Sequence, residues 1–172
     1  MPRPVAASGG APAEAVTGRG TGVDDAGWLR KVEVVRRALA VNRPDGSDGL
    51  DVLARVGGFE IAGLVGVVLA GAGRGIPLVL DGFISTAAGL IAATLAPDAR
   101  HALFASHRSA EPGHALALAH LGLEPYLDLS LRLGEGTGAA LFIHLARAAC
   151  LVYREMATFK SAGVSTSKRD QA

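Results

Sequence analysis

The sequence predicts an α/β fold with a parallel sheet and flanking helices, Rossmann-like but incomplete. Three short aliphatic runs, residues 76–80, 101–106 and 126–129, are the expected strands. Helical segments of ten or more residues alternate with them, and this alternation is typical of βαβ units with parallel strands. Since α/β sheets usually carry about five or six strands, three strands make a thin sheet.

Composition indicates a folded chain and excludes several classes of function. Hydrophobic residues make up 49% of the 172 residues, which is too apolar for disorder and indicates a large buried core or subunit interface. The apolar runs are shorter than the ~20 residues of a membrane span, so no membrane association is expected. A net charge of +1 offers no general attraction for nucleic acid. The single cysteine, Cys150, cannot form an intrachain disulfide, and we expect a cytoplasmic protein.

The length suits one domain with short tails. Residues 1–22 are rich in Ala, Gly and Pro and lack periodicity, so they are predicted to be a flexible lead-in. Residues 23–165 are predicted to form the α/β domain with its terminal helix. Residues 166–172 are predicted to be a disordered tail.

Helical periodicity predicts the other elements of the domain. Asp24 is a good N-cap for a helix whose apolar residues recur every three or four positions as far as Leu39. The helix predicted over residues 59–72 is apolar nearly all round, so burial between other elements is expected. Further helices are predicted over residues 50–56, 83–96, 111–121 and 137–161. The last is long and is expected to belong to a small helical subdomain.

Polar, glycine-rich segments follow all three predicted strands. They are residues 81–86, 107–114 and 132–138. Because ligands of α/β proteins bind at the carboxyl ends of strands, these segments are the candidate ligand-binding loops.

Glu135 lies in the third segment, between Gly134 and Gly136 and just ahead of a helix. Glycines on both sides allow a ligand to approach the backbone closely. The carboxylate could act as a proton acceptor if burial against apolar groups such as Leu133 raises its proton affinity. The alternative is a capping loop, in which Thr137 caps the helix and Glu135 interacts with its dipole.

Ser109 stands near the start of the helix predicted over residues 111–121. It is a plausible N-cap, and a free helix N-terminus with a hydroxyl is also a phosphate site. Lys31 is either a solvated cation or a point charge for a phosphate. His107 and His114 flank Ser109, but no third histidine or cysteine stands at a metal-like spacing, so no metal site is expected.

Four motifs stand in a fixed order along the chain. They are GRGTG at residues 18–22, VLDGF at 79–83, HRSAEPGH at 107–114 and LRLGEGTGAA at 131–140. In this order and spacing the chain resembles the nicotinate-nucleotide–dimethylbenzimidazole phosphoribosyltransferase family over about 150 residues. The third and fourth motifs together are highly specific to that family.

The resemblance implies a step of cobalamin assembly. Family members transfer the phosphoribosyl group of nicotinate mononucleotide to 5,6-dimethylbenzimidazole, giving α-ribazole phosphate and nicotinate, without a metal or cofactor. Glu135 matches the catalytic base, which takes a proton from one benzimidazole nitrogen while the other attacks the ribose C1′. The substrate-binding positions that the resemblance implies are Lys31, Asp81, Gly82, Ser109, Leu133, Gly134 and Gly136.

Family members are about twice as long as this chain. Their first half supplies further strands, most of the benzimidazole pocket and a glycine-rich phosphate loop. We therefore expect either a homodimer or a missing N-terminal half as partner, besides the two small-molecule substrates. The alternative is a truncated, non-catalytic nucleotide-binding or oligomerising fragment that keeps Ser109 and Glu135.

Overall fold

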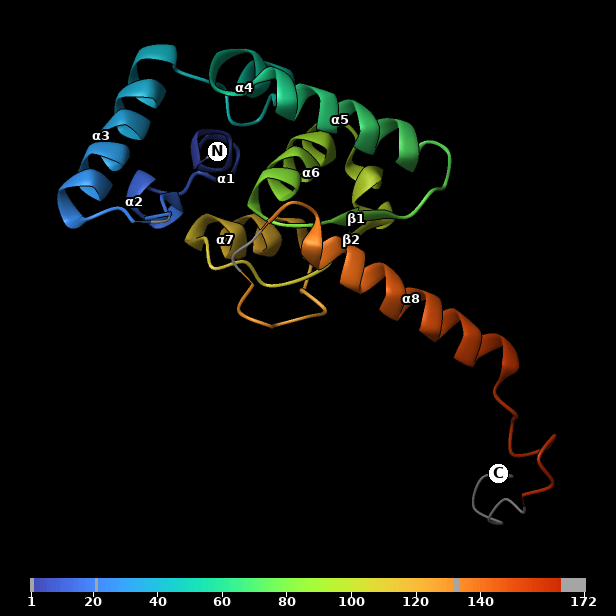
Figure 1. Ribbon diagram of the computed structural model, residues 1–172. Coiled ribbons are helices and arrows are strands. Elements are labelled where there is room, and N and C mark those ends of the chain that lie inside the picture. The colour runs from blue at the N-terminus through green and yellow to red at the C-terminus, as the bar shows by residue number, and fades with distance from the viewer. Residues whose placement is uncertain (1, 21, 132–133, 165–172) are drawn as a thin grey trace, which may run out of the picture. The chain divides into compact units, whose positions relative to one another are not determined.

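A computed structural model describes residues 2–20, 22–131 and 134–164 of the protein (Figure 1). The chain divides into two units, Met1–Phe142 and Ile143–Ala172. The first unit contains the sheet, and the second contains the greater part of the last helix. Across the described ranges, no helix is both long and apolar enough to cross a membrane.

Among the described residues, five helices precede the first strand, and the predicted alternation of helix and strand holds only from that strand onward. The helices are α1 (Pro2–Gly9), α2 (Ala13–Val16), α3 (Asp25–Asn42), α4 (Gly49–Val56), α5 (Phe59–Ala72), α6 (Phe83–Leu95), α7 (Pro112–Leu121) and α8 (Thr137–Glu155), with the 3₁₀ helix η1 (Pro97–Ala102). The strands are β1 (Leu78–Leu80) and β2 (Leu103–Ala105). Asp24 caps α3 as predicted, because its carboxylate accepts a hydrogen bond from the N–H of Gly27 at 2.7 Å. The long C-terminal helix is confirmed as well, although it ends at Glu155 rather than at residue 161.

The two strands are parallel and are joined through α6, so the predicted βαβ unit is confirmed. Leu78 pairs with Leu103 and Leu80 pairs with Ala105. The third predicted strand, residues 126–129, is wrong: in the described chain it forms only an isolated parallel bridge between Leu127 and His107. Its flanking side chains are exposed, and a strand of a parallel sheet needs burial on both faces.

Helix α6 lies at the centre of the first unit, in contact with α1, α4, α5, α7 and β1 (Figure 1). Its middle consists of small and aliphatic side chains, and Ala88, Ile91 and Ala92 are fully buried. An added Cβ at Gly89 would come within 3.2 Å of Leu80 on β1 and 3.3 Å of Leu103 on β2. Glycine at this position therefore lets the sheet pack closely on α6.

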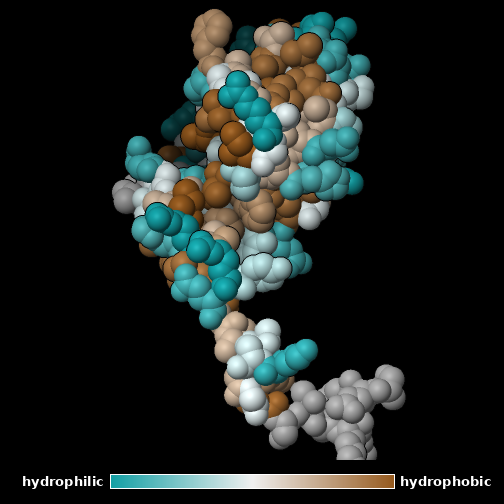
Figure 2. All heavy atoms as spheres, turned by 90° about the vertical axis from the view of Figure 1, so that its right-hand side faces the viewer, coloured by the Kyte–Doolittle hydropathy of each residue, from teal (hydrophilic) through white to brown (hydrophobic). Residues whose placement is uncertain are grey.

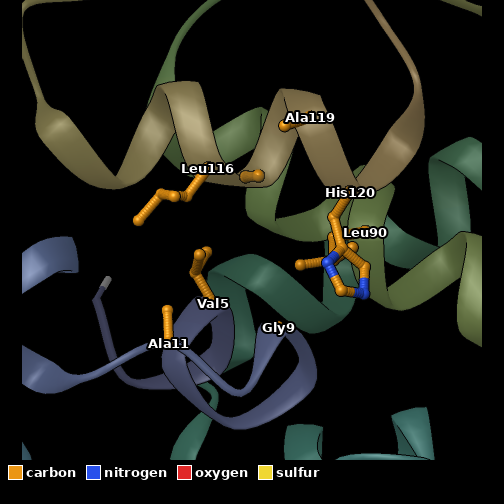
Figure 3. A pocket seen from close by; sticks show the side chains of 8 residues that line it. Val5, Gly9, Ala11, Leu90, Leu116, Ala119 and His120 are labelled. Atoms are coloured by element: carbon orange, nitrogen blue, oxygen red, sulfur yellow. The ribbon is translucent and has the colours of Figure 1, made fainter.

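The predicted flexible lead-in is corrected by the structure, because α1 and α2 pack into the core. Val5 and Val16 are buried and belong to the same hydrophobic cluster as Ile91 of α6. Figure 3 shows Val5 facing Leu116 of α7 across a small hollow of about 250 Å³. Two valines among alanines, glycines and prolines give no periodic signal, and tertiary packing rather than local pattern stabilises such short helices.

Helix α5 buries one face and exposes the other. Ile61, Val65 and Val68 point into the core, as expected of an apolar helix. Phe59 is 98% exposed and Val67 is 58% exposed, so the expected burial between elements holds for one face only. Figure 2 shows apolar side chains exposed beside charged ones on the molecular surface.

Candidate functional site

The loops that follow β1 and β2 line one cavity of about 1340 Å³ within the first unit, together with the segment before α8. The loop after α2 and part of α3 line it as well. The structure brings six of the predicted site residues to this cavity: Lys31, Asp81, Gly82, Ser109, Gly134 and Glu135. Leu133, the predicted wall of the acceptor pocket, lies outside the described residues.

Asp81 holds the glycine-rich loop that carries Glu135. Its Oδ2 accepts a hydrogen bond from the N–H of Gly136 at 3.2 Å, and its Oδ1 accepts one from the N–H of Ala139 at 3.0 Å. A carboxylate from the end of β1 thus interacts with the N-terminus of α8, where negative charge is stabilising. The capping role that the sequence left open for Glu135 and Thr137 is filled by Asp81, and Thr137 is already the first residue of the helix.

Glu135 is held in an unusual backbone conformation. Gly134, Glu135 and Gly136 have φ angles of 76°, 56° and 76°, all in the left-handed region. For glutamate this conformation costs about 1–3 kcal/mol, so it persists only where neighbouring contacts impose it. The hydrogen bonds to Asp81 are such contacts. The Glu135 residue is exposed and lines the cavity.

The side chain of His107 lies next to Asp81 and packs against the start of α8, directly after the same loop. Its side chain is 5% exposed, and Nδ1 lies 3.2 Å from Ser106 Oγ and 4.0 Å from Asp81 Oδ1. An added Cβ at Gly138 would overlap His107 Nδ1. Glycine at position 138 therefore allows the first turn of α8 to lie directly on the imidazole ring.

Ser109 occupies a turn before α7, but it is not the N-cap of that helix. The N-cap is Glu111, because Pro112 favours the first helical position and fixes where α7 begins. The Ser109 hydroxyl oxygen accepts a hydrogen bond from the N–H of Glu111 at 3.3 Å, which leaves the hydroxyl hydrogen to donate to a ligand. The helix terminus offers less than predicted, since Pro112 has no N–H and Gly113 is packed against Phe83.

Lys31 links α3 to the loop after α2. Its Nζ donates to the carbonyl oxygen of Gly18 at 2.6 Å and to that of Arg19 at 3.2 Å. An ammonium group has three donors, so one remains for a ligand in the cavity. Sequence reasoning singled out the GRGTG motif of this loop, but it named no site residue there because residues 1–22 were predicted to be flexible.

His114 is a buried residue that sequence reasoning left without a role. It is 1% exposed, and burial lowers its pKa from 6.5 to about 4, with the neighbouring His107 as the second cause. The ring is therefore neutral at physiological pH. No cluster of three or more metal-binding side chains occurs in the part of the chain that the structure describes.

These features define a class of protein: an α/β protein in which a lysine on α3, a serine after β2 and a carboxylate ahead of α8 line one cavity of about 1340 Å³. The family model DBI_PRT, described as a phosphoribosyltransferase, matches residues 5–164. The chain belongs to this family, which confirms the resemblance seen in the sequence.

Several named relatives are similar to the chain. It is 63% identical over 161 residues to the nicotinate-nucleotide–dimethylbenzimidazole phosphoribosyltransferase of Desulforudis audaxviator, covering 94% of this chain and 46% of that protein. The enzyme of the same name from Chloroflexus aggregans is 59% identical over 164 residues, with 95% and 46% covered. The crystal structure of CobT from Thermus thermophilus superimposes with a TM-score of 0.90 at 52% identity, covering 96% of this chain and 49% of that one. The chain thus spans about half the length of the curated relatives it matches.

Proposed function

We propose that the protein carries out phosphoribosyl transfer from nicotinate mononucleotide to 5,6-dimethylbenzimidazole, as part of cobalamin assembly. One acceptor nitrogen attacks the ribose C1′ as the bond from C1′ to nicotinate breaks, and the bonding electron pair leaves with nicotinate. The proton of the other acceptor nitrogen passes to the Glu135 carboxylate. The products are nicotinate and α-ribazole phosphate. The observation that carries this proposal is the convergence of Lys31, Ser109 and Glu135 on one cavity.

Glu135 has the placement that a general base needs. Its side chain is exposed at the cavity, and its backbone is fixed through the N–H of Gly136 to Asp81. A bound aromatic acceptor would cover the carboxylate and exclude water from it, which favours direct proton transfer. Asp81 uses both oxygens on backbone N–H groups, so we propose that it acts on the substrate through the loop it holds.

The nucleotide's phosphate would be bound by two side chains of different kinds. Lys31 supplies positive charge and its third N–H, while Ser109 supplies a hydroxyl hydrogen. Gly82 and the loop around Gly134 line the same cavity, and we propose that their backbone approaches the ribose.

A non-catalytic nucleotide-binding or oligomerising role is the second candidate. It is favoured by the match to only 46% of the Desulforudis relative and by the exposed apolar face of α5. We propose that this face, with Phe59 and Val67, contacts a second copy of the chain in a homodimer. A cytoplasmic location is also proposed, since the sole cysteine, Cys150, is an exposed free thiol.

Nicotinate release distinguishes the two candidates. The assay supplies nicotinate mononucleotide and dimethylbenzimidazole to the chain alone, and to the chain with the part of the Thermus thermophilus relative that it does not match. Acceptor-dependent release in either mixture supports transfer. Binding of nicotinate mononucleotide without release in both mixtures would favour the second candidate.

A further inference from the structure

A line of hydrogen bonds joins the Ser109 turn to the loop after β1 through two buried side chains. The backbone N–H of Ser109 donates to His114 Nδ1 at 3.1 Å. His114 Nε2 lies 3.1 Å from Thr86 Oγ1, which donates to the carbonyl oxygen of Gly82 at 2.8 Å. Ser109 and Gly82 line the cavity, whereas His114 and Thr86 are not among its described lining residues.

The first member of this line fixes the direction of every bond in it. A backbone N–H can only donate, so His114 Nδ1 must be the nitrogen without a proton. The ring hydrogen then lies on Nε2 and is donated to Thr86 Oγ1, whose own hydrogen points to Gly82. If the His114 ring were protonated, its Nδ1–H and the backbone N–H of Ser109 would both be donors and could not bond to each other. The line of hydrogen bonds therefore exists only while His114 is neutral.

The surroundings of His114 favour its neutral form. The ring lies between α6 and the turn after β2, with its centroid 6.4 Å from that of His107. Among the charged neighbours that affect it, His107 and Arg108 disfavour protonation and Asp81 favours it. Burial is the largest effect and acts in the same direction as His107 and Arg108.

We propose that His114, as the neutral tautomer with its proton on Nε2, is a positioning residue. It keeps the Ser109 turn and the Gly82 loop at a fixed distance from one another at the cavity. It does so without touching the ligand, because it acts through Ser109 on one side and Thr86 on the other. Since the Ser109 N–H is committed to His114, Ser109 offers a phosphate only its hydroxyl. The kinetic part of this inference rests on the proposed function, whereas the hydrogen-bond line does not.

Thr86 allows the line to be cut without changing the shape of the core. Thr86→Val replaces the hydroxyl by a methyl group, and Thr86→Ser keeps the hydroxyl. Thr94→Val is a matched control, since Thr94 also bonds the carbonyl four residues earlier on α6, that of Leu90, at 3.0 Å. Loss of both hydrogen bonds of Thr86 Oγ1, the one from His114 and the one to Gly82, should raise the KM for nicotinate mononucleotide about 5- to 10-fold in Thr86→Val, with kcat within about 2-fold of wild type. Thr86→Ser and Thr94→Val should keep the wild-type KM.

Nuclear magnetic resonance tests the line in the ligand-free protein. The imidazole ¹⁵N signals of His114 should show an unprotonated Nδ1 and a protonated Nε2 at pH 7. Thr86→Val should shift the amide signal of Ser109 through the ring, and Thr94→Val should leave that signal unchanged. These spectra decide the hydrogen-bond line whether or not the chain is active, and the wild-type tautomer decides it if Thr86→Val does not fold.

Each outcome has one consequence. A proton on His114 Nδ1, or a Ser109 amide that does not respond to Thr86→Val, would overturn the positioning role. An unchanged KM in an active Thr86→Val variant would overturn it as well. Absence of transfer by the wild-type protein would contradict the proposed function instead. The spectra alone would then test the positioning role of His114.

Discussion

Acidification from pH 7 to pH 4 should weaken the fold through one buried side chain, His114. Its pKa is lowered from 6.5 to about 4, chiefly by burial. In the unfolded chain this histidine takes up a proton as the pH falls through 6.5, whereas in the folded protein it does so only near pH 4. Its contribution to stability is complete above pH 6.5, declines as the pH falls, and levels off below pH 4. The separation of about 2.5 pKa units corresponds to about 3 kcal/mol.

Urea unfolding at several pH values between 7 and 4 measures this effect. Fluorescence of Trp28, whose Nε1 donates to the carbonyl oxygen of Thr17 at 2.8 Å, reports the transition. The control is His114→Gln, which removes the titration. Asp51, whose pKa is lowered by its hydrogen bond from Arg55, is present in both proteins and cancels in the difference. The free energy of unfolding should fall by about 3 kcal/mol more in wild type than in the variant. Parallel pH profiles would refute the assignment of a buried, neutral His114.

Three further substitutions test the site. Glu135→Gln should lower turnover at least ~100-fold with little change in the affinity for nicotinate mononucleotide, and steady-state kinetics with calorimetry would detect either an intact rate or a lost affinity. Ser109→Ala should weaken nicotinate mononucleotide binding by about 1–3 kcal/mol, because it removes a hydrogen bond to a charged phosphate; equal affinity in calorimetry would remove Ser109 from the site. Gly138→Ala should destabilise the fold by about 1–3 kcal/mol through overlap with His107, and an unchanged urea midpoint would contradict that packing.

The elements with strong local signals could be predicted from the sequence. The apolar run of α5 and the aliphatic runs of β1 and β2 were recognised, and α5 was placed at its observed ends. The prediction of a flexible segment over residues 1–22 failed because Val5 and Val16 are buried by helices distant in sequence, which no local pattern indicates. The prediction of a strand over residues 126–129 failed because a short aliphatic run does not show that both of its faces will be covered.

The sequence predicted which residues belong to the candidate site, but it did not predict the hydrogen bonds and contacts that join them. Spacing and resemblance pointed to Glu135, Ser109 and Lys31, and the structure brings all three to one cavity. The bond of Asp81 to Gly136 spans 55 residues, and the contact of His114 with Thr86 spans 28. Such pairings depend on how strands and helices pack, so no local pattern could indicate them. They explain why a glutamate tolerates a left-handed backbone and why a histidine is buried beside the cavity.

The stoichiometry of products tests the central claim most directly. The chain and the unmatched part of the Thermus thermophilus relative are incubated together with nicotinate mononucleotide and dimethylbenzimidazole. Nicotinate and α-ribazole phosphate are then quantified in the same sample. If Glu135 and the surrounding cavity transfer the phosphoribosyl group, one α-ribazole phosphate should form for each nicotinate released, and Glu135→Gln should reduce both together. Nicotinate release without α-ribazole phosphate, or equal formation of both products by the Glu135→Gln variant, would contradict the account.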